Sequence, residues 1–225
     1  MKRILYRTAA VLISAAVLFC IPVGAAVSIS AKSAVLIDGT SGQILWERRS
    51  EEQSLIASTT KIMTGLLIAE NCDIHEEVCV PKEAVGVEGS SLYLTEGQTL
   101  AVETLLYGMM LQSGNDAAAA LAIHHAGSIA HFSEKMNQKA KELGMTHSHF
   151  VNPHGLDAEH HYSTALDLAK LTAYAMENEL FRQVVSCKTI SFGNRTFTNH
   201  NKLLWQYEGA VGVKPVIQKP QAVFS

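Results

Sequence analysis

The sequence lacks the clustered basic excess that a nucleic-acid-binding surface requires, since 18 lysines and arginines stand against 21 acidic residues. It has no Cys-x-x-Cys pair, which argues against a zinc or thioredoxin-like site. Internal repeats are absent, and low-complexity stretches are few. With 48% apolar residues in a chain of 225, we predict a globular protein that binds no nucleic acid and has either one sizeable domain or a domain and a fragment.

The few cysteines leave two alternatives. Cys72 and Cys79 are close enough in sequence to form a disulfide in an oxidising compartment, and Cys187 would then have no disulfide partner. The alternative is that all three are buried or unpaired thiols, and this is the interpretation that we favour. Cys20 follows the bulky Phe19 where a lipobox requires a small residue, so we do not predict a lipoprotein.

The N-terminal apolar run, over residues 8–23, is shorter than the roughly 20 residues that a membrane-spanning helix needs. Three basic residues precede this run, and the small residues Gly24, Ala25 and Ala26 follow it. This order is typical of a secretory signal peptide. We therefore predict a signal peptide over residues 1–25 and a mature chain that is secreted to the extracytoplasmic, cell-wall side of the membrane.

The pattern of apolar residues predicts strands at both ends of the mature chain and helices between them. Hairpins are expected over 33–49 and 188–198, the second turning at Gly193-Asn194. Helices are expected over 57–70, 100–111, 116–125, 129–143 and 163–179, with a loop over 152–155. Strands followed by a block of helices and then strands again indicate an α+β fold, in which helices pack on an antiparallel sheet.

Ser58 and Lys61 lie three residues apart in a predicted helix, which puts both side chains on one face. A serine hydroxyl is a weak nucleophile and needs a base within hydrogen-bond reach. A lysine is such a base when burial or a neighbouring cation lowers its pKa. Taken alone, the same pattern also fits a capping serine followed by a surface lysine.

A second candidate motif, Ser113-Gly114-Asn115, falls on the short loop between two predicted helices. A hydroxyl and an amide on such a loop can be aimed with little freedom. The alternative is simple capping of the second helix by Asn115 or Asp116. Capping and catalysis are compatible, so both interpretations stay open.

A serine-x-x-lysine, a serine-x-asparagine and a lysine-threonine-glycine motif together are the signature of penicillin-binding proteins and class A β-lactamases. From about residue 33 to Lys214, the chain resembles the low-molecular-mass serine penicillin-binding proteins that are D-alanyl-D-alanine carboxypeptidases. A class A β-lactamase would have aspartate in place of Gly114. The segments that carry the resemblance are 36–38, 41–42, 57–64, 106–118, 152–157 and 161–165.

The resemblance implies a penicillin-binding, β-lactamase-like transpeptidase fold and a role for each motif residue. Ser58 would attack the terminal D-Ala-D-Ala bond, Lys61 would take its proton, and Ser113 would relay a proton to the leaving amine. Asn115 and Lys214 would bind the substrate. The implied partners are a peptidoglycan stem peptide ending in D-Ala-D-Ala and β-lactam antibiotics, with no cofactor or metal.

A metal-dependent DD-peptidase is a distant alternative, because the sequence has ten histidines. They form no His-Glu-x-x-His motif, and their pairs fall at predicted helix ends and loops. We interpret most of them as surface or structural residues.

The third motif departs from the family pattern, because Pro215 and Val216 follow Lys214 where threonine and glycine are expected. Proline has neither a hydroxyl nor an N–H, and valine adds a branched side chain where glycine permits close approach. Deleting one adenine from a coding sequence for Lys-Thr-Gly-Tyr-Thr-Lys-Ala-Ala-Gly-Arg-Phe-Leu yields residues 214–225 as they stand. We therefore expect an incomplete catalytic domain over 26–214 and a frameshifted tail over 215–225.

Two hypotheses follow. The first is a secreted DD-carboxypeptidase acting through an acyl-enzyme on Ser58. The second is a truncated, non-catalytic remnant that at most binds peptidoglycan. The family's later strands and its membrane-binding C-terminal helix are expected to be missing, so that membrane association belongs only to a full-length form.

Overall fold

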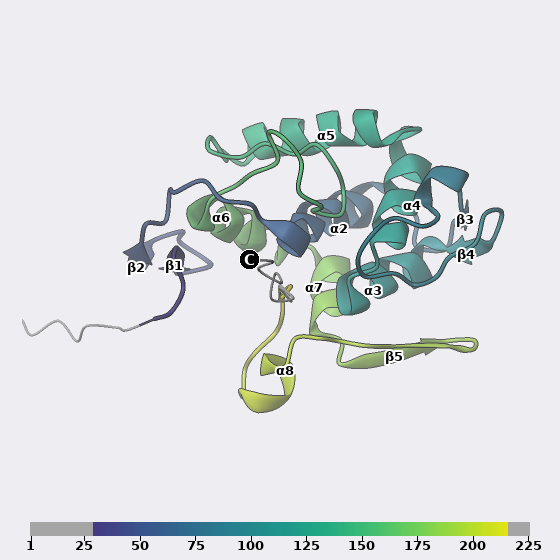
Figure 1. The fold of residues 1–225 in the computed structure, drawn as a ribbon. Coiled ribbons are helices and arrows are strands. Elements are labelled where there is room, and N and C mark those ends of the chain that lie inside the picture. The colour runs from purple at the N-terminus through teal and green to yellow at the C-terminus, as the bar shows by residue number, and fades with distance from the viewer. Residues whose placement is uncertain (1–28, 216–225) are drawn as a thin grey trace, which may run out of the picture. The chain divides into compact units, whose positions relative to one another are not determined.

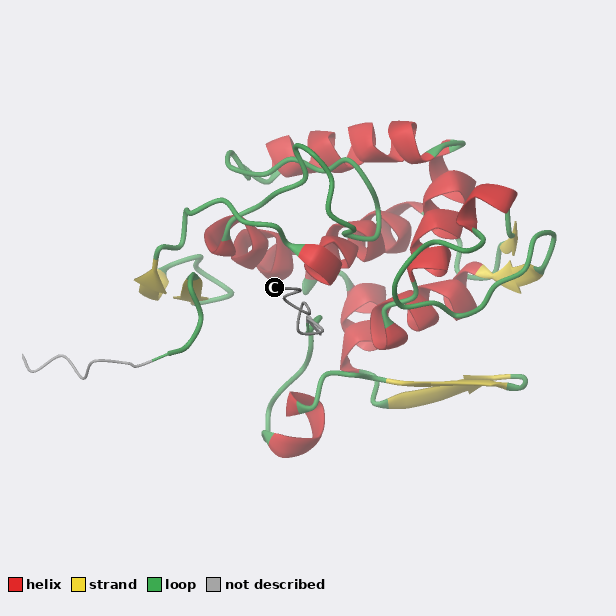
Figure 2. Cartoon of the chain, in the orientation of Figure 1, coloured by secondary structure: helices red, strands yellow, loops and turns green. Residues whose placement is uncertain are grey.

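The structure, a computed structural model, describes residues 29–215 (Figures 1 and 2). The predicted signal peptide and residues 216–225 lie outside the described residues. The chain divides into two units, Met1–Ala31 and Lys32–Ser225, and the fold given below is that of the second unit. Within residues 29–215, no helix is both long enough and apolar enough to cross a membrane.

Three helices form the centre of the fold: α2 (Thr60–Asn71), α3 (Val102–Gln112) and α4 (Asn115–Ala126). They pack on one another, and nearly all their apolar side chains are buried. The alanine-rich α4 is apolar on most sides and is buried, as its composition predicts. Gly65 lets α2 approach its neighbours closely, because a Cβ there would lie 3.0 Å from the sulfur of Met110.

Three more helices cover this centre: α5 (Ile129–Glu142), α6 (Ala165–Ala175) and α7 (Glu179–Ser186). Each begins at a residue whose side-chain oxygen accepts a backbone N–H from the first turn, and these caps are Ser128, Thr164 and Asn178. Such caps are typically worth about 1 kcal/mol each.

The predicted single helix over 163–179 is wrong in its extent. It ends at Ala175, and Asn178 starts the separate helix α7, which the sequence did not predict. The predicted helix over 100–111 likewise starts only at Val102, because Thr99–Ala101 form a strand. A short helix, α8 (Leu203–Gln206), follows near the end of the described chain.

The strands form three separate two-stranded antiparallel sheets within residues 29–215. Both predicted hairpins are confirmed, and the turn of the second falls at Gly193-Asn194, whereas the sheet of β3 and β4 was not predicted. The fold class is α+β. The pairs are β1 (Ala34–Ile37) with β2 (Ile44–Arg48), β3 (Glu77–Cys79) with β4 (Thr99–Ala101), and β5 (Thr189–Phe192) with β6 (Arg195–Thr198).

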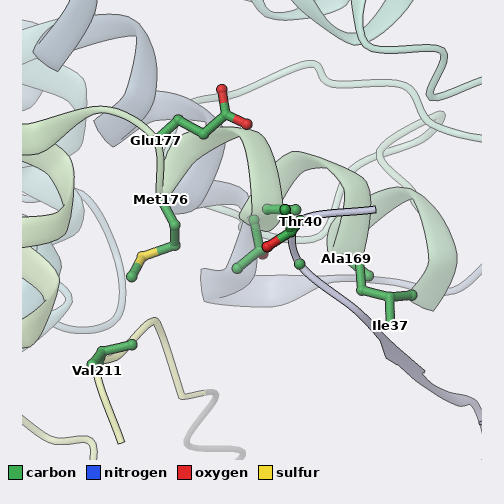
Figure 3. A pocket seen from close by; sticks show the side chains of 9 residues that line it. Ile37, Thr40, Ala169, Met176, Glu177 and Val211 are labelled. Carbon is green, nitrogen blue, oxygen red and sulfur yellow. The ribbon is translucent and has the colours of Figure 1, made fainter. Parts of the chain in front are cut away.

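The β1–β2 hairpin lies against α6, and a pocket of about 580 Å³ opens between them (Figure 3). Ile37 and Thr40 come from the hairpin end, Met176 and Glu177 follow α6, and Val211 comes from the end of the described chain. No residue of the three sequence motifs lines this pocket.

The cysteines within the described residues are free thiols, namely Cys72, Cys79 and Cys187. Cys72 Sγ lies 3.6 Å from Nδ1 of His125. Burial, with help from the charge of Glu76, raises the pKa of the Cys72 thiol to about 11. The interpretation as unpaired thiols is thereby confirmed.

Candidate active site

Ser58 lies in η1 (Ala57–Thr59), a single 3₁₀ turn that leads directly into α2. The preceding Ala57 has a φ of 43°, in the left-handed region that residues with a Cβ rarely adopt. The Thr59 hydroxyl donates to the carbonyl of Ile56 and closes the turn. The Ser58 side chain is therefore presented by a tight, strained turn, a backbone feature that recurs at functional sites.

Lys61 is fully buried one turn further on, with a relative exposure of 0%. Its Nζ lies 3.3 Å from Ser58 Oγ, 2.6 Å from Asn115 Oδ1 and 2.6 Å from the carbonyl oxygen of His154. Burial lowers the pKa of the Lys61 ammonium to about 7, although the carboxylate of Asp116 acts in the opposite direction. The interpretation of Lys61 as a surface residue is wrong.

Ser113 ends α3 in the left-handed conformation, with a φ of 66°, and its hydroxyl donates to Ser58 Oγ over 3.0 Å. The two serines, 55 positions apart in the chain, thus meet beside Lys61. Gly114, between Ser113 and Asn115 in the second motif, has no room for a side chain, since a Cβ there would lie 2.7 Å from Cγ of Leu92. An aspartate, expected here in a class A β-lactamase, would not fit without a shift of Leu92.

Asn115 is the first residue of α4, and its side chain bridges two other segments. Oδ1 accepts from Lys61, and Nδ2 donates to the carbonyl of Glu88. The alternative of capping by Asn115 is therefore wrong. The neighbouring Asp116 is also buried, and its carboxylate accepts N–H groups of the preceding loop, those of Leu92 and Leu94 among them.

The loop over residues 152–155 completes the site through its backbone. The Pro153 carbonyl accepts from the Thr64 hydroxyl over 2.6 Å, and the next carbonyl, that of His154, accepts from Lys61. Gly155 has a φ of +92°, and a Cβ there would lie 1.8 Å from the Ala57 carbonyl oxygen. No role in the site was predicted for this loop from its residues. The residues of this loop contribute to the family resemblance. Its contacts in the site are made by backbone carbonyls, however, and every residue has one, so the sequence does not indicate them.

Two buried histidines lie behind the turn. Nδ1 of His161 accepts from the N–H of Val151, so the ring proton is on Nε2 and is donated to Thr60 Oγ1, 2.8 Å away. Burial lowers the pKa of both His154 and His161 to about 4, and the charge of Lys61 adds to the shift of His154. Both rings are therefore neutral near pH 7. Their place behind the turn fits the interpretation of the histidines as structural residues.

Lys214 lies outside the network that joins Ser58, Lys61, Ser113 and Asn115. Its Nζ donates to the carbonyls of Met109 and Met110, 3.2 and 2.7 Å away, in the last turn of α3. Burial, followed by the charge of Lys61, lowers the pKa of Lys214 well below its usual value. Pro215 follows directly. Within residues 29–215, no three His, Cys, Asp or Glu side chains are grouped so that they could hold a metal ion.

This arrangement fixes the direction of the Lys61 amine. A neutral amine has two N–H groups and one lone pair, and two carbonyl-type oxygens lie at 2.6 Å, on Asn115 and on the His154 backbone. Because neither oxygen can donate, the two N–H groups are used there and the lone pair is left for the hydroxyl of Ser58. Ser58 can then donate to Lys61 while it accepts from Ser113, so the site can deprotonate a serine.

A comparison with protein families gives the same result as the motifs. The model of the peptidase S11 family, described as D-alanyl-D-alanine carboxypeptidase, matches residues 22–215. The chain belongs to this family. It is 38% identical over 194 residues to the D-alanyl-D-alanine carboxypeptidase DacF of Bacillus subtilis, covering 82% of this chain and 50% of the relative. The chain therefore spans about half the length of that relative.

Solved structures of penicillin-binding proteins share the fold. Penicillin-binding protein 6B of Escherichia coli is 36% identical with a TM-score of 0.76, over 81% of this chain and 61% of that one. A mutant of the Streptomyces K15 DD-transpeptidase is 32% identical with a TM-score of 0.79, over 84% of this chain and 81% of that one. The predicted penicillin-binding fold is confirmed for this member of the family.

Proposed function

We propose that this chain is a serine-type D-alanyl-D-alanine carboxypeptidase that acts through an acyl-enzyme on Ser58. The observation that carries the proposal is the environment of Lys61. A buried amine whose two N–H groups are used by Asn115 and the His154 carbonyl directs its lone pair at Ser58. A pKa of about 7 provides the neutral base at physiological pH.

In the proposed reaction, Ser58 Oγ attacks the carbonyl carbon of the terminal D-Ala-D-Ala peptide bond while its proton passes to Lys61 Nζ. The Ser58 backbone N–H would provide part of the oxyanion hole for the tetrahedral intermediate. When the C–N bond breaks, Ser113 passes its hydroxyl proton to the leaving amine and receives in exchange the proton held by Lys61, so that both residues return to their starting states and D-alanine departs. Water then attacks the ester on Ser58, which releases the shortened peptide and restores the serine hydroxyl.

Substrate binding is assigned to Asn115 and Lys214. The amide nitrogen of Asn115 uses one hydrogen on the Glu88 carbonyl, and its second is available for a substrate carbonyl. Burial lowers the pKa of Lys214, and a substrate carboxylate beside Nζ would favour the ammonium form again. The ammonium form has three N–H donors, of which two contact Met109 and Met110. We assign the third to the C-terminal carboxylate of the substrate.

The setting proposed for this reaction is the extracytoplasmic, cell-wall side of the membrane, after removal of residues 1–25. The substrate there would be a peptidoglycan stem peptide that ends in D-Ala-D-Ala. β-Lactam antibiotics would acylate the same Ser58 hydroxyl, and the attack would be assisted by Lys61 in the same way. No resident metal or cofactor has a part in this scheme.

Labelling with a fluorescent penicillin tests the proposal, because only an assembled Ser58 site becomes covalently modified. We expect the parent protein to be labelled, Ser58→Ala to show no label, and Ser191→Ala, which removes an exposed hydroxyl on β5, to match the parent. D-alanine release from a pentapeptide should follow the same order. Undiminished labelling of Ser58→Ala would refute the assignment.

One observation favours the second candidate, a non-catalytic protein that binds peptidoglycan. Pro215 supplies neither a hydroxyl nor an N–H beside Lys214. A protein that co-sediments with peptidoglycan but takes no penicillin label would be of this second kind.

A further inference from the structure

Tyr93 has the most exposed side chain among the large apolar residues that lie outside the two hairpins and the C-terminal segment. It is 86% exposed, whereas its neighbours Leu92 and Leu94 are only 6% and 4% exposed. Its φ of 58° is in the left-handed region, which is a genuine outlier for a bulky residue. An unusual backbone conformation thus turns a large aromatic ring out into solvent between two buried side chains.

The backbone on both sides of Tyr93 is fixed. The buried carboxylate of Asp116 accepts the N–H of Leu92 at 2.9 Å and that of Leu94 at 3.1 Å, together with the Ser91 hydroxyl at 2.6 Å. The carbonyl of Leu92 accepts from the Arg195 guanidinium over 3.0 Å. The Tyr93 N–H itself donates to Ser91 Oγ over 2.9 Å. The ring is therefore held out on a rigid loop, an arrangement that lowers the entropy cost of binding a ligand.

This loop is attached to the candidate active site. The backbone N–H of Asn115 donates to the Ser90 carbonyl over 2.7 Å, and its side chain donates to Glu88. The Leu92 side chain occupies the space next to Gly114, between the two polar residues of the second motif. Tyr93 thus follows directly on a residue that lies next to this motif, in a loop that is hydrogen-bonded to Asn115.

We propose that Tyr93 is a specificity-determining residue that contacts the substrate residue immediately before D-Ala-D-Ala. This inference rests on the proposed function, in which Asn115 binds a substrate carbonyl, and it takes this carbonyl to lie on the acyl side of the scissile bond. The acyl part of the peptide then leaves the site past the loop that carries Tyr93. A tyrosine ring offers a large face with few rotatable bonds. The chemistry that fits it is a linear aliphatic side chain of several carbons laid across the ring.

Equilibrium binding tests the proposal without any need for turnover. In a Ser58→Ala background, calorimetry would compare two ligands. One is the tripeptide Lys-D-Ala-D-Ala acetylated on both amines, and the other is acetyl-D-Ala-D-Ala, which lacks the residue in question. We expect Tyr93→Ala to weaken tripeptide binding by about five- to tenfold, as for the loss of one covered aromatic face. Tyr93→Phe should stay within about twofold, and neither change should alter dipeptide binding.

The control is Tyr207→Ala, which removes another exposed tyrosine, at 70% exposure, outside the site. It should bind both peptides as the Ser58→Ala parent does, and all variants should melt together because both rings are in solvent. Unchanged tripeptide binding by Tyr93→Ala, an equal loss for the dipeptide, or no tripeptide binding by the parent would overturn the inference. Penicillin labelling is measured separately, on the protein that retains Ser58. If that protein is labelled but Tyr93→Ala does not change tripeptide binding, this inference fails and the proposed function stands.

Discussion

The helical centre of α2, α3 and α4 and the β1–β2 hairpin differ in how they treat large apolar side chains. In the helices, Met63, Leu66 and Leu105 are 0% exposed, whereas Leu36 and Leu45 in the hairpin are 56% and 57% exposed. The candidate active site follows the same division. Its hydrogen bonds run between the helical centre and the loop over 152–155, and no hairpin residue takes part in them.

The difference separates two tasks that the proposed function requires. Activation of the nucleophile depends on Ser58, Lys61, Ser113 and Asn115, which the densely packed centre holds in place. Capture of the substrate carboxylate is assigned to Lys214, which follows α8 at the end of a stretch, residues 203–214, with several exposed apolar side chains. These are Leu203, Trp205, Tyr207 and Val211. We infer that damage to the centre removes chemistry, whereas damage to the periphery weakens binding.

The largest effect is expected for Lys61→Ala. Loss of the base should slow acylation by penicillin by about 10²–10⁴-fold. Lys214→Ala should leave covalent labelling measurable but require a higher penicillin concentration, because it removes a carboxylate contact and leaves the base. The exposed Lys188→Ala serves as the control for lost charge. Full-rate acylation of Lys61→Ala would contradict its role, and equal losses in the two buried variants would contradict the separation of tasks.

Two glycines offer a sharper form of the comparison. Gly155→Ala would put a Cβ 1.8 Å from the Ala57 carbonyl at a φ of +92°, whereas nothing lies within 4 Å of a Cβ at Gly39. We expect Gly155→Ala to lower the free energy of unfolding by about 3 kcal/mol or more and to abolish labelling. Gly39→Ala should change the free energy by about 0.5 kcal/mol or less. Urea denaturation measures both, and a Gly155→Ala protein as stable as Gly39→Ala would break the comparison.

How much the centre and the hairpin contribute to stability can be measured with one leucine from each. Leu66→Ala should cost about 2–5 kcal/mol, because it leaves a cavity in the packed centre. Leu45→Ala, at a side chain that is 57% exposed, should cost about 0.5 kcal/mol or less. Equal shifts of the two urea midpoints would mean that the hairpin is as cooperative a part of the fold as the helices are.

The part of the candidate site that could be predicted from local spacing in the sequence is the contact between Ser58 and Lys61. One helical turn brings Lys61 next to Ser58, a contact that follows from periodicity. The contact of Ser113 with Ser58 joins residues 55 positions apart, and a role for Ser113 was expected only from the family resemblance. The acceptor on His154 could not be predicted, because every residue has a carbonyl and only the tertiary fold decides which one meets Lys61. The same holds for Lys214, whose contacts on Met109 and Met110 are more than 100 residues away in the chain.

The errors in secondary structure have a similar cause. The strands β3 and β4 have three residues each, too few for an alternating pattern, and they are joined through a long irregular segment. The break between α6 and α7 at Asn178 is set by a cap inside a stretch that keeps its helical periodicity. Tertiary contacts decide the pairing of β3 with β4, whereas the break at Asn178 depends on a local cap that the pattern of apolar residues does not reveal.

The last comparison concerns pH, and it again distinguishes the buried region from the surface. The folded-state pKa of His154 and of His161 is about 4, below the ordinary value of 6.5. Between these two values the unfolded chain binds more protons than the folded one, so stability is fully present above pH 6.5 and falls as pH falls toward 4. Lys61 acts in another window, between its folded pKa of about 7 and the usual 10.5, where stability rises with pH.

His161→Gln is expected to flatten the loss of stability between pH 6.5 and 4, since glutamine does not titrate and can still donate to Thr60. The flattening should be partial, because the pKa values of His154, His125 and His200 are lowered as well. Urea midpoints at half-unit pH steps measure the slopes. If the His161→Gln protein kept the slope of the parent, the buried ring would not be held neutral by its surroundings, and the bond from Nε2 to Thr60 would have to be reassigned.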